Sequence, residues 1–236
     1  MKKLTSLFLF LIFSGCSVNP VTGQKDFVMM SENQEISLGK KYHAQVLQQT
    51  PSYKDQELQD YVQGIGDSLS IKSHRPNLFY RFTVLDSPEI NAFALPGGYI
   101  YINRGLMAYL SSEEELAAVL GHEIGHVTAR HSVRQYSQSQ LLGILSTAVQ
   151  MNSGRTAGDI VGVASGALLA GYGREMELEA DELGAKYIHQ DGYSTDGMMS
   201  VLSVLKNQEI YSKELAKERG QEPRNYHGVF ASHPSN

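Results

Sequence analysis

Hydrophobic and polar residues follow two periods along this chain, and these periods predict both helices and strands. Segments with helical spacing of apolar residues are expected to form helices with one buried face; they cover residues 31–49, 55–70, 174–190 and 195–218. The first of them begins at a capping-box pattern, Ser31 followed by Gln34. Apolar and polar residues alternate over 80–84, and 99–102 is an aromatic and β-branched run, so both are expected to be strands. The pattern predicts an α+β fold that is mostly helical.

The clearest helix begins near Ser111 and Ser112. Each serine is followed three residues later by a glutamate, as in a capping box, and the acidic residues at 113–115 suit the positive end of a helix dipole. The apolar residues that follow form one stripe: Leu116, Val119, Leu120, Ile124 and Val127. We expect this helix to continue past Arg130.

The first residues of the chain are typical of an export signal. Lysines at positions 2 and 3 precede an apolar run, Leu4 to Phe13, which is followed by Ser14, Gly15 and Cys16. The run is shorter than the roughly 20 apolar residues that span a membrane. Small residues before a cysteine resemble the lipobox of bacterial lipoproteins, in which the cysteine is lipidated and becomes the first residue. The serine after Cys16 favours the outer membrane, by resemblance to the sorting pattern of these proteins.

Residues 140–172 form a second unusual segment, because Arg155 and Asp159 are its only charged residues. A membrane hairpin is one interpretation. The polar residues at 150–155 interrupt the apolar run, however, and leave each half too short to span a bilayer. We therefore expect two buried or groove-lining helical pieces around a turn.

The composition excludes several classes of function. A hydrophobic fraction of 42% is that of a globular protein rather than a disordered one. The 25 acidic and 20 basic side chains give a net charge of −5. The chain therefore has no excess of basic residues, and no nucleic-acid partner is expected. A single cysteine builds neither an intramolecular disulfide nor a cysteine-rich zinc site. Any metal would therefore be held by histidine and carboxylate side chains.

A candidate for such a site is the sequence His122-Glu123-Ile124-Gly125-His126, in the middle of the clearest helix. Four residues correspond to about 400° of helix, so both imidazoles project from one face. Two imidazoles at this spacing can bind one Zn²⁺. The carboxylate of Glu123 can then reach a metal-bound water rather than the metal itself. The motif therefore predicts two zinc ligands and a general base.

A catalytic zinc site needs a third protein ligand, and the acidic residues within 174–181 are the best candidates. Glu177 and Asp181 are four residues apart on one helical face. One could bind the metal while the other accepts a hydrogen bond from a ligand imidazole. Glu175 and Glu179 are expected to be solvated, although spacing alone does not decide between Glu177 and Glu179.

The remaining histidines have no spacing typical of a ligand. His131 is nine residues after His122, about half a turn from the ligand face, so it cannot bind the same metal if the helix continues. We interpret it as structural or solvated, together with three others: His43, His74 and His189.

The complete pattern resembles a known family. The zinc motif, followed some fifty residues later by Arg174-x-x-Glu177-x-x-Ala180-Asp181, resembles the signature of the HtpX and CAAX-prenyl-endopeptidase type of zinc metallopeptidase, a gluzincin group. Residues 19–23, 91–98 and 103–106 resemble the exported bacterial branch of this family. The resemblance covers nearly all of 17–236, and relatives usually continue beyond the last residue of this chain.

This resemblance implies a zincin-like fold with a small sheet beside the active-site helix. It also implies three segments: a lipoprotein signal peptide at 1–15, a lipidated linker at 16–30 and a zinc metallopeptidase domain at 31–236. One zinc ion per chain would be held by three ligands: His122, His126 and Glu177. Glu123 would activate a zinc-bound water as general base, and Asp181 would be the carboxylate behind a ligand histidine.

Three further features of the site are expected. The oxyanion that forms when water attacks the peptide carbonyl needs an additional electrophile. Four residues are candidates: Arg174, Tyr226, His227 and His233. His233, near the end of the chain, could also reach the open metal position and silence the enzyme. The turn at 96–98 and the strand after it are expected to form the edge of the cleft, where an extended substrate adds by backbone hydrogen bonds.

We therefore expect a zinc metalloendopeptidase that hydrolyses unfolded or misassembled exported and outer-membrane proteins. It would face the periplasm of a Gram-negative bacterium, held at the outer membrane by lipid on Cys16, with the outer-membrane assembly machinery as a candidate partner. Two alternatives are a zinc-bearing periplasmic chaperone or assembly factor with little proteolysis, and a passive lipoprotein with incidental histidines.

Overall fold

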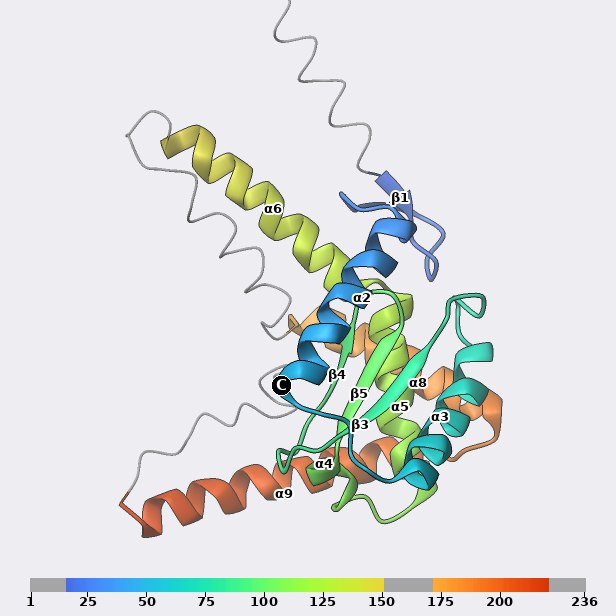
Figure 1. The fold of residues 1–236 in the computed structure, drawn as a ribbon, viewed down its shortest axis with the longest axis vertical. Helices are drawn as coiled ribbons and strands as arrows, with labels where there is room; N and C mark the ends of the chain where they lie inside the picture. Colours follow the sequence, from blue (N-terminus) through green and yellow to red (C-terminus); the bar gives the residue numbers. More distant parts are fainter. Residues whose placement is uncertain (1–15, 151–171, 221–236) are drawn as a thin grey trace, which may run out of the picture.

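The computed structural model describes residues 16–150 and 172–220 of the chain (Figure 1). The strands are β1 (Cys16–Val18), β2 (Lys25–Phe27), β3 (Arg81–Leu85), β4 (Ala92–Leu95) and β5 (Tyr99–Asn103). The helices are α2 (Glu32–Gln49), α3 (Gln56–Ile71), α4 (Arg104–Met107), α5 (Glu113–Thr128), α6 (His131–Gln150), α8 (Arg174–Asp191) and α9 (Asp196–Glu218). The expected mostly helical α+β class is confirmed. The expected signal peptide and the tail with Tyr226, His227 and His233 lie outside the described residues.

Serine caps begin two of the helices as the sequence predicts. At α2 the hydroxyl of Ser31 accepts from the amide of Gln34, whose side chain accepts from the amide of Ser31. At α5 the hydroxyl of Ser112 accepts from the amide of Glu115. The carboxylate of Glu115 in turn accepts from the amide of Ser111, at 2.6 Å. The two overlapping patterns thus form one cap, in which Ser112 supplies the side chain and Ser111 the backbone.

A three-stranded sheet lies between α2 on one side and α5 with α3 on the other (Figure 1). Strand β5 is in the middle, parallel to β3 and antiparallel to β4. Successive side chains of β5 point to opposite faces of the sheet. Ile100 and Ile102 belong to the main core on one face, whereas Tyr101 packs with residues of α2 on the other face. The sheet therefore has apolar residues on both faces, and β4 was not predicted because its four residues show no clear period.

The prediction that the turn at 96–98 and the strand after it form the edge of the cleft is wrong, because β5 is paired on both sides. The turn before it is also covered: Gly97 and Gly98 have φ values of 77° and 90°, and a Cβ on Gly97 would lie 2.8 Å from the Cα of Ile36 in α2. The outer edge of β3 is occupied by α3, whose Gln59 and Gln63 side chains accept from amides of that strand. Within the described sheet, β4 is therefore the edge that remains, and it lies against α5.

Helices α5 and α8 pack in unusually close contact. A Cβ on Gly184 of α8 would lie 2.8 Å from the amide nitrogen of His122, and one on Gly125 of α5 would lie 2.7 Å from the carbonyl oxygen of Ala180. Only residues without a side chain allow the two backbones to approach this closely. This contact brings the acidic residues of α8 to the histidine face of α5.

The helix expected to continue past Arg130 stops at Thr128, so that prediction is wrong. Arg130 has a left-handed φ of 56°, and α6 begins at the next residue, His131. A non-glycine residue pays roughly 1–2 kcal/mol for this conformation. Three hydrogen bonds of the Arg130 guanidinium offset that strain, and they go to Glu35 at 2.9 Å, to the Ser17 hydroxyl at 2.7 Å and to the Met30 carbonyl at 3.1 Å.

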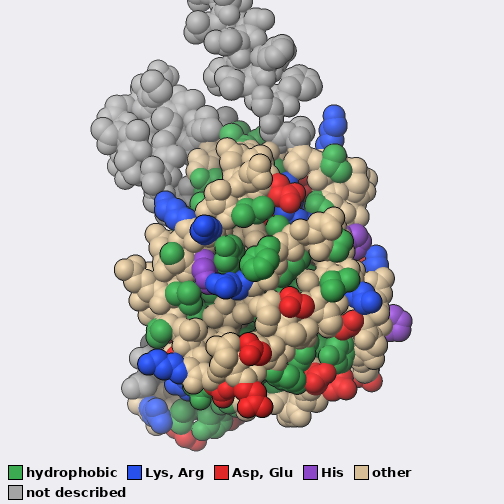
Figure 2. Space-filling view, turned by 45° about the vertical axis from the view of Figure 1, so that its right-hand side comes forward, with side chains coloured by type: hydrophobic (Ala, Val, Ile, Leu, Met, Phe, Trp, Pro, Cys, Tyr) green, Lys and Arg blue, Asp and Glu red, His purple; other side chains and the backbone are tan. Residues whose placement is uncertain are grey.

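The outer parts of the molecule are less compact than this centre. Helix α6 and the second half of α9 extend away from the sheet (Figure 1). Figure 2 shows one face on which apolar side chains are exposed among polar ones, with acidic residues mostly in its lower half. Among the described helices, none combines the length and the apolar character needed to cross a membrane. Most of the segment expected to form two helical pieces lies outside the described residues.

Candidate metal centre

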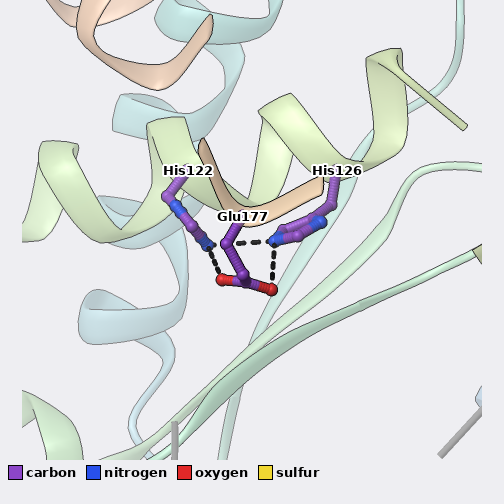
Figure 3. Close-up of side chains that lie close together, drawn as sticks. All are labelled: His122, His126 and Glu177. Atoms are coloured by element: carbon purple, nitrogen blue, oxygen red, sulfur yellow. Dashed lines mark hydrogen bonds and ion pairs between the residues drawn. The ribbon is translucent and has the colours of Figure 1, made fainter. Parts of the chain in front are cut away.

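Three side chains converge on one point between α5 and α8. His122 and His126 project from α5 towards the carboxylate of Glu177 on α8 (Figure 3). The two Nε2 atoms are 3.0 Å apart, and they lie 3.5 Å and 3.7 Å from the Glu177 oxygens. These potential ligand atoms all lie within 4.8 Å of one another. The three side chains thus form one candidate metal site.

The donor set and its dimensions fit zinc. Two imidazoles and one carboxylate are one of the ligand sets found in catalytic zinc sites, where a fourth position is left open. Ligand atoms about 2.0–2.1 Å from a tetrahedral zinc ion are about 3.3 Å from one another. The three separations measured here lie close to that value on either side. Small side-chain movements would therefore complete the coordination.

The far side of His122 is oriented by a carboxylate. Its Nδ1 lies 2.8 Å from the Oδ1 atom of Asp181, one turn after Glu177 on α8. Burial lowers the pKa of His122, but the hydrogen bonds to Asp181 and Glu177 outweigh this effect and raise the pKa to about 10. These carboxylates thus make the point between the helices favourable for positive charge.

The far side of His126 contacts another histidine. The Nδ1 atoms of His126 and His131 are 2.8 Å apart, and the Nε2 of His131 lies 3.0 Å from the Oε2 of Glu179. Burial lowers the pKa of His131, whereas the hydrogen bonds from His131 and Arg134 lower the pKa of Glu179 to about 2. Glu179 was expected to be solvated; its side chain is 26% exposed and is paired with both His131 and Arg134.

An aromatic ring closes the inner side of the site. The ring of Tyr172 stacks on His126, with centroids 4.2 Å apart and an interplanar angle of 19°. Its hydroxyl is 2.7 Å from the hydroxyl of Ser132 at the start of α6. Both His126 and Tyr172 are buried. The stack holds the imidazole plane of His126 in a fixed orientation.

The other predicted residues have different positions. Glu123 is 1% exposed, and its charge contributes to the raised pKa of His122, so it lies near the ligand cluster. Arg174 is exposed at the first residue of α8. Cys16 begins β1, where its Cα pairs with that of Phe27. His227 and His233 lie outside the described residues.

Sequence reasoning missed three residues around His126: His131, Glu179 and Tyr172. A continuous helix would place His131 half a turn from the ligand face, and the break at Arg130 removes that restriction. The sequence contains one indication of this contact: the two histidines are only five positions apart, so a break between them could bring the second ring back to the first. Tyr172 follows an apolar segment that has no readable period.

Comparisons with known proteins agree with this geometry. The model of peptidase family M48 matches residues 54–236. A beta-barrel assembly-enhancing protease from Yersinia pestis is 29% identical over 204 residues, which cover 81% of this chain and 42% of that protein. Metalloprotease YcaL from Escherichia coli (strain K12) is 30% identical over 128 residues, 52% of this chain and 50% of that protein.

A eukaryotic relative is also similar. The mitochondrial metalloendopeptidase OMA1 from Arabidopsis thaliana is 33% identical over 122 residues, which are 51% of this chain and 24% of that protein. The chain spans less than half the length of the beta-barrel assembly-enhancing proteases that it matches. The family model covers most of the chain and confirms the resemblance inferred from the motifs. The chain belongs to peptidase family M48.

Proposed function

We propose that this protein is a zinc-dependent metalloendopeptidase. The observation that supports it most is the convergence of His122, His126 and Glu177, with Glu123 buried beside them. We assign the first three as zinc ligands and Glu123 as the general base. A purely structural site needs no buried carboxylate next to its ligands, so the presence of Glu123 favours catalysis.

Each residue has a role that follows from its contacts. Zinc held at this site would supply Lewis acidity, which polarises a peptide carbonyl and lowers the pKa of water. A carboxylate oxygen of Glu123 accepts a proton from the attacking water and transfers it to the leaving amine. Asp181 accepts a hydrogen bond from the Nδ1–H of His122, which leaves the Nε2 lone pair directed at the cluster.

The sheet supports an assignment for the substrate site. Strand β4 is the outer strand beside α5, whereas β5 is central and the side chains of α3 occupy the edge of β3. An extended peptide can add to such an edge through backbone hydrogen bonds, which depend little on sequence. We therefore propose that unfolded segments of proteins bind along β4 with the scissile bond near Glu123.

The biological setting is inferred from the sequence and from the names of relatives. A lipidated Cys16 would hold the protein at the outer membrane, facing the periplasm. The relatives named for enhancing beta-barrel assembly suggest unfolded or misassembled outer-membrane proteins as substrates and the assembly machinery as a partner. We propose a role in quality control of the cell envelope on this basis.

The decisive test replaces the base and keeps the ligands. Purified Glu123→Gln protein should contain one zinc per chain, as the wild type does, and should lose about 10²- to 10⁴-fold in cleavage of unfolded casein. Glu182→Gln, an exposed carboxylate on α8, is the matched control and should cleave normally. Cleavage by Glu123→Gln at the wild-type rate would overturn the assignment. Loss of cleavage with intact rescue of an outer-membrane client would favour the chaperone alternative.

A further inference from the structure

Behind His126 a row of polar side chains leads away from the candidate metal site. His131 lies 2.8 Å from His126 between Nδ1 atoms, Glu179 lies 3.0 Å from the Nε2 of His131, and Arg134 lies 2.9 Å from the same oxygen of Glu179. The His131 side chain is fully buried, whereas those of Glu179 and Arg134 are about one quarter exposed. The row thus connects a buried imidazole to a carboxylate near the surface.

The positions of the protons in this row follow from chemistry, once His126 is a zinc ligand as proposed above. A neutral imidazole has one donor and one acceptor nitrogen. If the Nε2 of His126 faces the metal, its Nδ1 carries the proton and donates to the Nδ1 of His131. The proton of His131 is then on Nε2, where it donates to the carboxylate of Glu179. Every contact in the row has one donor and one acceptor.

We propose that His131, Glu179 and Arg134 are positioning residues that fix the tautomer and the ring orientation of His126, and thereby set the affinity of the site for zinc. We call this set the His126 relay. A ligand histidine usually donates its second nitrogen directly to a carboxylate, a carbonyl or water. Here a second histidine stands between the Nδ1 of His126 and the carboxylate of Glu179, so the support of this nitrogen passes through His131.

The fold builds the relay through the break between α5 and α6. The left-handed backbone of Arg130 ends α5, and His131 as first residue of α6 meets the last turn of the preceding helix. On α8, Glu177 and Glu179 are two residues apart and therefore about 200° apart around the axis. One faces the metal site and the other faces α6.

A test must separate positioning of a ligand from general support of the fold. We suggest measuring zinc affinity of the full chain by competition with a chromophoric chelator, and the d–d spectrum of the cobalt-substituted protein. His131→Leu removes both hydrogen bonds and should weaken zinc about 10- to 100-fold, the range for partners of ligand histidines. It should also shift the cobalt spectrum, because the ring of His126 keeps its stacking on Tyr172 but loses the hydrogen bond to its Nδ1.

Two further variants test the contacts of His131 and of Glu179 separately. His131→Asn keeps an acceptor near the position of Nδ1 and should bind zinc more tightly than His131→Leu. Glu179→Gln removes the charged acceptor at the far end and should weaken zinc by a smaller factor. Because Glu179 is partly exposed, this variant decides the question if His131→Leu does not fold.

Matched controls remove similar groups elsewhere. His74→Leu deletes a histidine whose Nδ1 lies 2.6 Å from the Tyr187 hydroxyl, and Glu175→Gln alters an exposed carboxylate of α8. Both should leave zinc affinity and the cobalt spectrum unchanged. Wild-type zinc affinity and an unchanged cobalt spectrum in folded His131→Leu and Glu179→Gln would overturn the relay alone. A wild-type protein that binds no zinc would overturn the metal assignment itself.

Discussion

The two histidines of the candidate metal centre are held in different ways. His122 is the outer one, with a side chain 15% exposed, and it contacts the carboxylate of Asp181 directly. His126 is fully buried under Tyr172 and reaches the carboxylate of Glu179 only through His131. We call the contact of Asp181 with His122 the outer support, and the contacts of His131 and Glu179 behind His126 the inner support. The outer support needs only the regular spacing of residues on α5 and α8. The inner support also needs α5 to end and α6 to begin at His131.

This difference shows where the stability of the site resides. The outer support depends on how closely α5 and α8 approach, because Asp181 and Glu177 share one helix. The inner support depends on Arg130, whose unusual backbone is held by the buried carboxylate of Glu35. Arg75 contacts the same carboxylate at 2.7 Å. Loss of the Glu35 contacts should therefore disturb the inner side alone, whereas a shift of α8 should disturb both sides, because Glu179 also lies on α8.

The largest effect is expected from removing the charge of Glu35, which disturbs the inner side. Glu35→Gln removes the buried counter-charge that two buried guanidinium groups share and should lower the free energy of unfolding by about 3–5 kcal/mol. Urea unfolding followed by circular dichroism measures this change. Glu32→Gln is the matched control on the same helix: its side chain is 64% exposed and lies 3.8 Å from Arg75. That substitution should cost at most about 1 kcal/mol, and equal effects would contradict the role of the buried network.

The close approach of α8 to α5, on which the outer side depends, should be disturbed by a methyl group on Gly184. The new Cβ would lie 2.8 Å from the backbone of His122, so Gly184→Ala should force α8 away from α5 and destabilise the protein by about 1–3 kcal/mol. Gly64→Ala in α3 has no atom within 4 Å of the new Cβ and should instead be stabilising by about 0.4–1 kcal/mol. Thermal unfolding of the two variants tests the opposite signs, and a neutral Gly184→Ala would show that the helices do not need their close contact.

A smaller effect is expected for Asp181→Asn. The amide is a poorer acceptor for the Nδ1–H of His122, so zinc affinity should fall about 10- to 100-fold. Chelator competition measures the affinity. Comparison with Glu179→Gln then ranks the outer and inner supports, and an unchanged zinc affinity would show that Asp181 does not orient His122.

The smallest effect is expected at the start of α5, far along the helix from both supports. Ser112→Ala removes the hydroxyl that accepts from the amide of Glu115 and should cost about 1 kcal/mol of unfolding free energy. Ser111 uses only its amide in this cap, so Ser111→Ala should be nearly neutral. Zinc affinity should be the same in both variants. A reversed order of the two stabilities would show that the cap is misassigned.

Much of the outer side could be predicted from local spacing. His122 and His126 share a helical face because they are four residues apart, and Glu177 and Asp181 share another for the same reason. Local hydrogen bonds also made the caps at Ser31 and Ser112 readable. The edge of the cleft was misplaced, because strand order is a long-range property that no local period contains.

By itself, the sequence determined the helical period, the caps, the zinc motif and the family, since each depends on residues within a few positions or on a recognisable spacing. Only the tertiary structure decided that the clearest helix ends before Arg130, and that His131 and Glu179 then meet behind His126. The physical reason is that the left-handed turn is unfavourable locally. It is stabilised by Glu35, a residue 95 positions away in sequence that only folding brings into contact.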